Sequence, residues 1–184
     1  RRAAEDLLIE VSPRVVADGS GGALVSFSHV LGPTGIHVLR FGADGAIAPG
    51  WPVEGVPLTT AQVTAQGMVP DGSGGAYVMW TVGFPADSAR LMVGRIGANG
   101  AIPAGWAAGG RAVTSGPGQA TPKLLADGSG AAVMVWRDRR ASVGFGSSIC
   151  AQKVLATGAN ASGFSALGRV IVAREAGSTD TFQF

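Results

Sequence analysis

The sequence predicts an all-β protein built from three copies of one four-stranded unit. The first observation is a glycine-rich string, Asp-Gly-Ser-Gly-Gly/Ala-Ala, which recurs at a pitch of about 55 residues from Asp18, Asp71 and Asp127. The second is a turn string of the type Gly-Ala-Asp-Gly-Ala, which recurs at a similar pitch, and the third is the lack of a helical stretch. A fixed period of this size indicates one supersecondary unit whose copies bury their apolar faces against their neighbours.

Each unit begins with an apolar strand that leads into the glycine-rich string. The three copies of this strand contain Val15-Val16, Met68-Val69 and Leu124-Leu125. Glycine then supplies the positive-φ positions of a tight turn, and aspartate and serine can hydrogen-bond back to the turn backbone. A calcium loop would need several oxygen ligands at alternating positions, whereas these strings offer mostly glycine. We therefore expect the aspartates to form turns, and we predict no metal site.

The second and third strands of each unit are joined by a connection of variable length. The second strands each end on an aromatic residue, and they are Ala23–Phe27, Ala76–Trp80 and Ala132–Trp136. The connections at 28–35, 81–90 and 137–148 share almost nothing in length or sequence, which predicts exposed loops. The third strands are Ile36–Phe41, Leu91–Ile96 and Ile149–Val154.

The fourth strand follows a second turn and another aromatic residue that recurs in register. These aromatic residues are Trp51, Trp106 and Phe164. The predicted fourth strands are Gly55–Thr59, Gly110–Thr114 and Gly168–Val172. Pro57 cannot donate a ladder hydrogen bond, so this strand is expected at the edge of its sheet.

Four meandering strands per unit with aromatic residues at fixed positions are typical of a β-propeller blade. The chain resembles the bacterial secreted β-propeller repeat proteins, whose blades read Pro-x-Val-x-x-Asp-Gly-x-Gly-Gly-Ala-x-Val-x-Trp. The resemblance is carried by Pro13–Phe27, Val69–Trp80 and Pro122–Trp136, and by the Trp136-Arg137-Asp138-x-Arg140 string of the third unit. It implies a β-propeller-type array in an extracellular, cell-surface or periplasmic location.

Three blades are fewer than the ~4–8 that normally close a propeller. The blades are predicted at about 12–60, 61–115 and 116–173, with 174–184 beginning a further repeat or forming a closing strand. Leu7-Leu8-Ile9 reads as a fourth strand left over from a preceding blade. We expect a partial propeller, or one completed by an oligomer, whose open flanks bind protein: further blades of a longer polypeptide or another subunit.

Composition restricts the function classes. The chain has 184 residues, the length of one domain or two small ones, with 46% hydrophobic and only 14% charged residues. Its net charge is +2, and it has one short basic cluster, Arg137–Arg140, which Asp138 interrupts. We interpret this cluster as a solvated loop and predict no nucleic-acid binding. The sequence contains no run of about 18 apolar residues, so we predict no membrane-spanning segment.

Residues that could carry chemistry are few. The single cysteine, Cys150, excludes an internal disulfide and a cysteine-based zinc cluster, and is expected to be a small buried hydrophobe. His29 and His37 occur in one unit only, without repeated acidic companions. We therefore expect no catalytic residues and no cofactor.

Three hypotheses remain, of which the third and least favoured is one part of a propeller enzyme whose catalytic groups lie on other blades. The first is a non-catalytic structural or protein-interaction scaffold, which rests on analogy between folds. The alternative is a carbohydrate-binding, lectin-like propeller in which Trp51, Trp106 and Phe164 stack on sugar rings. The competing interpretation of these aromatic residues is that they pack between neighbouring blades.

Overall fold

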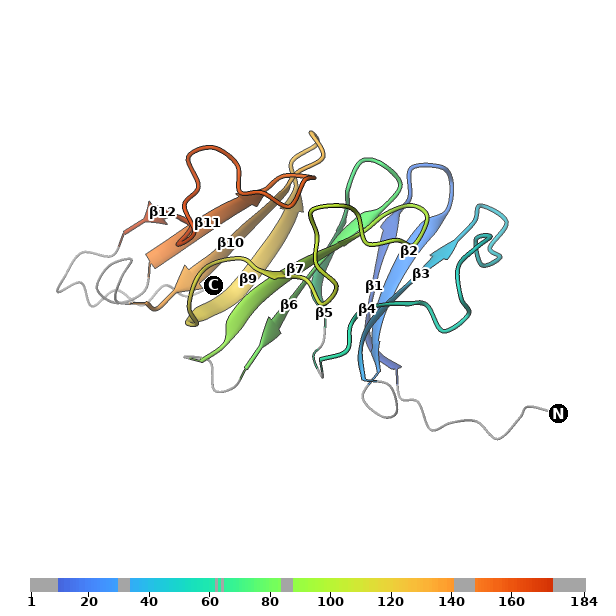
Figure 1. The fold of residues 1–184 in the computed structure, drawn as a ribbon, viewed down its shortest axis with the longest axis horizontal. Helices are drawn as coiled ribbons and strands as arrows, with labels where there is room; N and C mark the ends of the chain where they lie inside the picture. Colours follow the sequence, from blue (N-terminus) through green and yellow to red (C-terminus); the bar gives the residue numbers. More distant parts are fainter. Residues whose placement is uncertain are drawn as a thin grey trace.

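The computed structural model describes residues 10–29, 34–61, 63, 65–83, 88–140 and 148–173 of the chain. These residues form twelve β-strands and no helix. The strands make three four-stranded antiparallel sheets that stand side by side in chain order (Figure 1). The predicted all-β fold with three four-stranded units is therefore confirmed.

Each sheet is a meander of four consecutive strands. The first sheet contains β1 (Glu10–Ala17), β2 (Ala23–His29), β3 (Gly35–Phe41) and β4 (Val56–Thr59). The second sheet contains β5 (Ala65–Pro70), β6 (Ala76–Val82), β7 (Arg90–Ile96) and β8 (Arg111–Ala112). The third sheet contains β9 (Gln119–Ala126), β10 (Ala132–Asp138), β11 (Ser148–Val154) and β12 (Arg169–Val172). The strands predicted at Leu7-Leu8-Ile9 and in residues 174–184 lie outside the described residues.

The glycine-rich strings form the predicted turns between the first and second strands. The amide of Asp18 donates to the carbonyl of Gly22 at 3.1 Å. Gly19 and Gly21 have φ angles of 78° and 89°, in the left-handed region that glycine enters without a Cβ clash. Equivalent bonds close the other two turns, from Asp71 to Gly75 and from Asp127 to Ala131.

The variable connections are shorter than the sequence predicts. β2 runs on to His29 and β10 to Asp138, because the ladder to the third strand continues, as between Arg137 and Ile149. His29 and Asp138 are both buried. The prediction of exposed loops is therefore wrong at the strand residues Ser28, His29, Asp138 and Ser148. The prediction of a solvated basic loop is wrong for Asp138 and for Arg140, which pairs with it. Ladder pairing places these strand residues inside sheets rather than in solvent.

The core lies between the sheets rather than within any one of them. We call the face that each sheet turns toward the following sheet its forward face, and the opposite face its rear face. One cluster joins the first sheet's forward face to the second sheet's rear face, and it includes Leu24, Ile36, Val38, Leu58, Ala76, Val78, Trp80 and Ile96. The other joins the second sheet to the third in the same way, and it includes Tyr77, Met79, Leu91, Val93, Val113, Ala132, Met134, Trp136, Cys150 and Val154.

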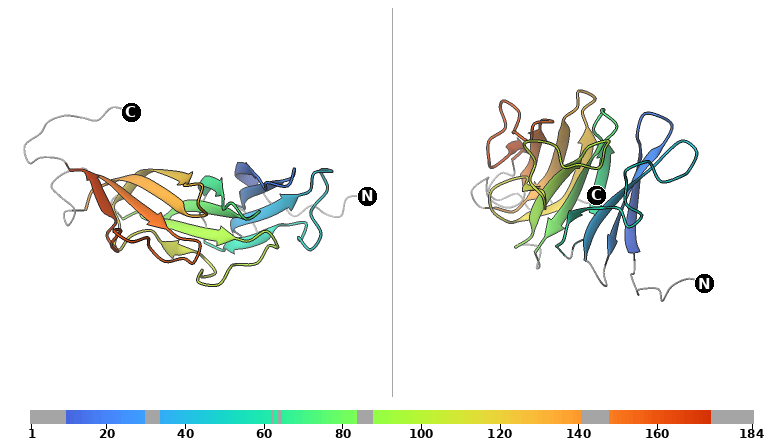
Figure 2. Two further views of the ribbon diagram at one scale, coloured as in Figure 1. Left: turned by 90° about the horizontal axis from the view of Figure 1, so that it is seen from above. Right: turned by 45° about the vertical axis from the view of Figure 1, so that its right-hand side comes forward.

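The second sheet thus contributes to both clusters, because successive residues of a strand point to opposite faces. Both views in Figure 2 show it between the other two sheets. Cys150 is buried in the second cluster, as the sequence predicts, and burial raises the pKa of its thiol to about 11. The two outer sheets each leave one face without a neighbouring described sheet.

Candidate functional site

The aromatic residues that were candidates for sugar binding lie at the junctions between sheets. Trp51 is 7% exposed and Trp106 is 8% exposed. The Trp51 ring lies against the second sheet, where a Cβ added to Gly100 would come within 3.5 Å of it. The Trp106 indole Nε1 donates to the carbonyl of Ala156 in the third sheet at 2.9 Å. Both indoles therefore have a packing role, and neither presents a free ring face for stacking on a sugar.

Phe164 holds the matching position in the third sheet, where no following sheet lies among the described residues. It is half-buried, unlike the two tryptophans. The three aromatic residues therefore do not come together in one site. Each lies on its own sheet, about one repeat from the next.

The carboxylate of Asp18 forms an Asp–Arg turn cluster at the end of the first sheet. Its Oδ1 accepts the amides of Ser20 and Gly22 at 2.8 and 2.9 Å, and its Oδ2 accepts the Ser20 hydroxyl at 2.7 Å. Arg40 donates to the same Oδ2 from Nε at 3.0 Å and from Nη2 at 2.7 Å. Ser20, and after it Arg40, hold the pKa of Asp18 well below its usual value of 3.8. The predicted role of this aspartate as a turn former is observed.

The second and third sheets repeat this cluster with one difference. Asp71 binds Arg95 with the same two distances, 3.0 and 2.7 Å. Asp127 instead binds Lys153, at 2.6 Å. Among the described residues, no group of three histidine, cysteine or acidic side chains is placed to hold a metal ion. The aspartates are thus neutralised by basic side chains of their own sheets.

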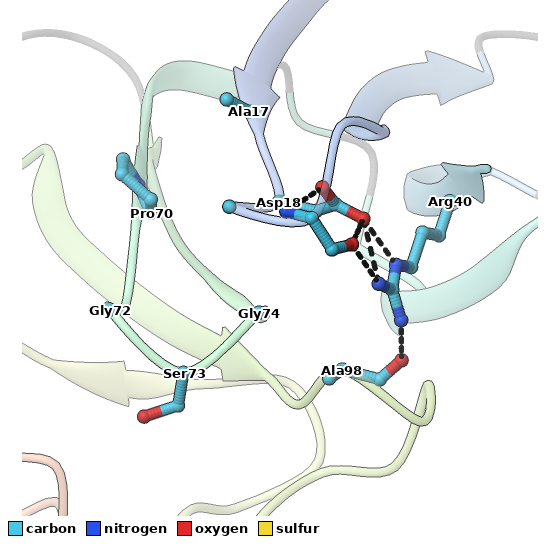
Figure 3. A pocket seen from close by; sticks show the side chains of 10 residues that line it. Ala17, Asp18, Arg40, Pro70, Gly72, Ser73, Gly74 and Ala98 are labelled. Carbon is cyan, nitrogen blue, oxygen red and sulfur yellow. Dashed lines mark hydrogen bonds and ion pairs between the residues drawn. The ribbon is translucent and has the colours of Figure 1, made fainter. Parts of the chain in front are cut away.

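The turns of the first two sheets enclose a hollow of about 610 Å³ (Figure 3). Its two charged lining residues are Asp18 and Arg40, which face each other across their ion pair, and the other lining residues are glycine, alanine, proline and serine. Since acid and base neutralise each other, the hollow offers a ligand no free charge.

At the junction between the second and third sheets, the Tyr77 hydroxyl donates to the carbonyl of Gly130 at 2.6 Å. Leu24, the residue that matches Tyr77 in the first sheet, has no side-chain donor and cannot make this hydrogen bond.

The Trp136-Arg137-Asp138-x-Arg140 string forms a buried network. Asp138 Oδ2 accepts hydrogen bonds from the indole Nε1 of Trp136 at 2.7 Å and from Nη2 of Arg140 at 2.5 Å. Arg140 also donates to the carbonyl of Leu167 at 2.7 Å. Asp138 is fully buried, and its carboxylate is occupied by these partners. The string therefore ties β10 to the segment before β12, which is a structural role.

The two histidines stack on each other in the first sheet. Their ring centroids are 4.3 Å apart, with an interplanar angle of 12°. His37 Nδ1 lies 3.0 Å from the carbonyl of Glu54, while His29 has no hydrogen-bond partner among the described residues. Burial lowers the pKa of His37 below its usual 6.5. Sequence reasoning missed this contact, because the two rings meet only through the pairing of β2 with β3.

The forward face of the third sheet carries exposed apolar side chains, among them Leu125, which is 63% exposed. We define it by residues of β9, β10 and β11 that share this side through strand pairing, namely Lys123, Leu125, Val133, Val135, Arg137 and Ile149. Val135 is 37% exposed, whereas Met79, its match in the second sheet, is 1% exposed. The face contains a hollow of about 380 Å³ beside Val135 and Ile149. It is the candidate functional site.

Sequence reasoning anticipated an open flank but did not identify these residues. Aligning the repeats matches Val133, Val135 and Ile149 to residues of the second sheet, but only the structure shows that those residues are buried.

A scan against protein-family models and a search of curated proteins found no match to this chain. The described residues contain no helix long and apolar enough to cross a membrane.

Proposed function

We propose that this chain is a non-catalytic β-propeller-type scaffold that binds protein through the forward face of the third sheet. It would act as a segment or subunit of a larger assembly. The observation that carries the proposal is the exposure of apolar side chains at positions that are buried in the second sheet. The resemblance of the repeats to secreted propeller proteins is the ground for proposing an extracellular, cell-surface or periplasmic location.

The chemistry of this face suits a protein partner. Val135, Leu125 and Ile149 provide apolar surface, and Lys123 and Arg137 provide polar groups beside it. An apolar centre with a polar surround is typical of protein interfaces, and contiguous exposed apolar patches mark interaction sites. The forward face of the third sheet is also the outer face of the described repeats, and each unit of a repeat array is stabilised by its neighbours.

The glycan-binding alternative would need indole faces that sugars can reach. Because Trp51 and Trp106 are buried against the following sheets, stacking would require those sheets to separate. We therefore favour the scaffold. Screening the wild-type chain on a glycan array separates the two functions. Glycan binding that is lost in Trp106→Ala, at an unchanged melting temperature, would favour the lectin.

A photo-crosslinking amino acid at position 135 tests the proposed function directly. Introduced in place of Val135 in the native host cells, it should capture a protein that mass spectrometry identifies. The matched control replaces Ala107, an exposed residue of the connection between β7 and β8 in the second unit, whose sheet is covered on both faces. Capture at position 135 but not at 107 supports the scaffold. Absence of any captured protein at position 135 would contradict it.

A further inference from the structure

We infer that the forward face of the third sheet binds the rear face of the first sheet of a second copy of this chain, so that two copies close a ring of six sheets. The inference rests on the proposed function and names its partner. Its basis is that the chain already contains two junctions of one design. At each, a forward face packs on a rear face, and the outer sheets carry the two halves of a third such junction.

The first matched contact joins the innermost strands. Between the second and third sheets, a Cβ added to Gly67 of β5 would lie 3.2 Å from the Cβ of Leu124 on β9. By their distance from the turn aspartates, the corresponding residues of the open faces are Lys123 and Val15. Val15 is 68% exposed, although its match in the second sheet, Met68, is buried. Lys123 and the Val15 of the second copy would therefore lie side by side.

The second matched contact is an aromatic ring on a glycine turn. Trp51 lies 3.5 Å from a Cβ added to Gly100, and Nε1 of Trp106 lies 3.6 Å from one added to Gly158. The glycine at this position of the first sheet is Gly45, and no atom lies within 4 Å of a Cβ added to it. Phe164 is therefore an aromatic ring with no glycine turn of a following sheet packed against it. Gly45 is a glycine turn with no aromatic ring packed on it. Packing Phe164 on Gly45 of the second copy would complete both.

The third matched contact comes from the edge strands. Leu58 of β4 packs on the second sheet, where a Cβ added to Gly94 would lie 3.1 Å from it. Leu58 and Val113 are each 1% exposed, whereas Ile171, at the same position in the third sheet, is 56% exposed. An apolar side chain is thus present at this position of the third sheet without the surface that buries its two counterparts.

The fourth matched contact is polar. Arg40 Nη1 donates to the carbonyl of Ala98 in the second sheet at 3.0 Å, and Arg95 Nη1 donates to that of Ala156 in the third at 2.8 Å. Lys153 holds this position in the third sheet. The carbonyl that matches belongs to Ala43, in an exposed turn of the first sheet. A basic donor and its acceptor are therefore both available for the junction between copies.

The number of sheets that a closed ring can hold favours an assembly of two copies. Propellers close with ~4–8 blades, a range that includes the six sheets of two copies and excludes the nine sheets of three copies. A heterologous interface forms a ring when its rotation closes and an open filament when it does not. Two copies use both open faces of each chain in two identical junctions. The expected assembly is a symmetric dimer with about twice the 18.4 kDa mass of the chain.

Disulfide trapping of the innermost contact tests the inference in the full chain. In a Cys150→Ala background, one preparation carries Lys123→Cys and another carries Val15→Cys. The contact between Gly67 and Leu124 predicts a spacing within reach of a disulfide. Mild oxidation of the mixture should therefore give a covalent dimer. The matched control pairs Lys123→Cys with Val53→Cys, because Val53 is equally exposed but precedes β4 at the opposite edge of its sheet.

A chain that carries both Lys123→Cys and Val15→Cys should give a covalent dimer without higher species. A second measurement is light scattering of the wild type and of Ile171→Asp, which places a charge on an exposed position and should weaken dimerisation at least ~10-fold. A monomeric wild type, a ladder of larger oligomers, or equal trapping at Val53 would overturn the inference. If position 135 captures a different protein in cells while the disulfide fails to form, the proposed function holds and the second copy is excluded.

Discussion

The second and third sheets have the same architecture but differ in what covers their forward faces. Met79 and Val113 of the second sheet are buried under the third. Val135 and Ile171, at the matching positions of the third sheet, are exposed apolar residues. The difference shows that burial in this array is a property of the junction between sheets. A side chain becomes core only when the next sheet is present, which is the nearest-neighbour behaviour of repeat proteins.

The aromatic position should give the largest difference between the two sheets. Trp106→Ala removes a buried indole and its hydrogen bond to Ala156, so we expect a loss of ~3–5 kcal/mol in the free energy of unfolding. Phe164→Ala, at the open junction, should cost about 1 kcal/mol or less in the monomer. Urea unfolding at low protein concentration measures both. Equal losses for the two variants would mean that Phe164 is as well packed as Trp106.

The basic position should give a smaller difference. Arg95→Lys keeps the charge beside Asp71 but loses the bond to the Ala156 carbonyl in the third sheet, at a cost of about 1 kcal/mol. Lys153→Arg should change monomer stability by less than about 0.5 kcal/mol, since no following sheet lies within the described residues. The same urea titrations compare the two variants. A clear loss in Lys153→Arg would show that the pair of Lys153 with Asp127 is already optimal.

The histidine pair should make the first sheet sensitive to mild acid. Burial lowers the pKa of His37 in the folded state below the usual 6.5, with the nearby His29 adding to this effect. The unfolded chain then binds the proton more tightly. The stability due to the neutral ring is therefore present above about pH 6.5 and is lost as the pH falls below it.

Replacing His37 by the residue at the matching position of the second sheet, in the variant His37→Met, should flatten this loss. Melting temperatures between pH 7.5 and 5 measure the slope for wild type and variant. An unchanged slope would assign the sensitivity to another group.

The smallest effect concerns a buried hydroxyl. Ser26 is fully buried, and its Oγ has no hydrogen-bond partner among the described residues. Ser26→Ala should leave stability unchanged or raise it by up to about 1 kcal/mol, because an unsatisfied buried polar group is costly. The control is Val135→Ser, at the matching exposed position of the third sheet. It should change the free energy of unfolding by less than about 1 kcal/mol. A loss above about 1 kcal/mol in Ser26→Ala would reveal a hydrogen bond to that hydroxyl.

The sequence by itself determined the local parts of this protein. Asp18 and its counterparts predict turns because their hydrogen bonds lie within four residues along the chain, and glycine supplies the φ angles that these turns need. The repeat pitch then gave three four-stranded units, with the aromatic residues in register.

Only the tertiary structure decided which faces are covered. The burial of His29 and Asp138, the bond between Tyr77 and Gly130, and the exposure of Ile171 depend on residues far along the chain. Strand alternation places a residue on one face or the other, but whether that face meets protein or solvent is a sum of contacts with another sheet. Since identical positions of the repeat have opposite environments, no pattern within one repeat could reveal the candidate site.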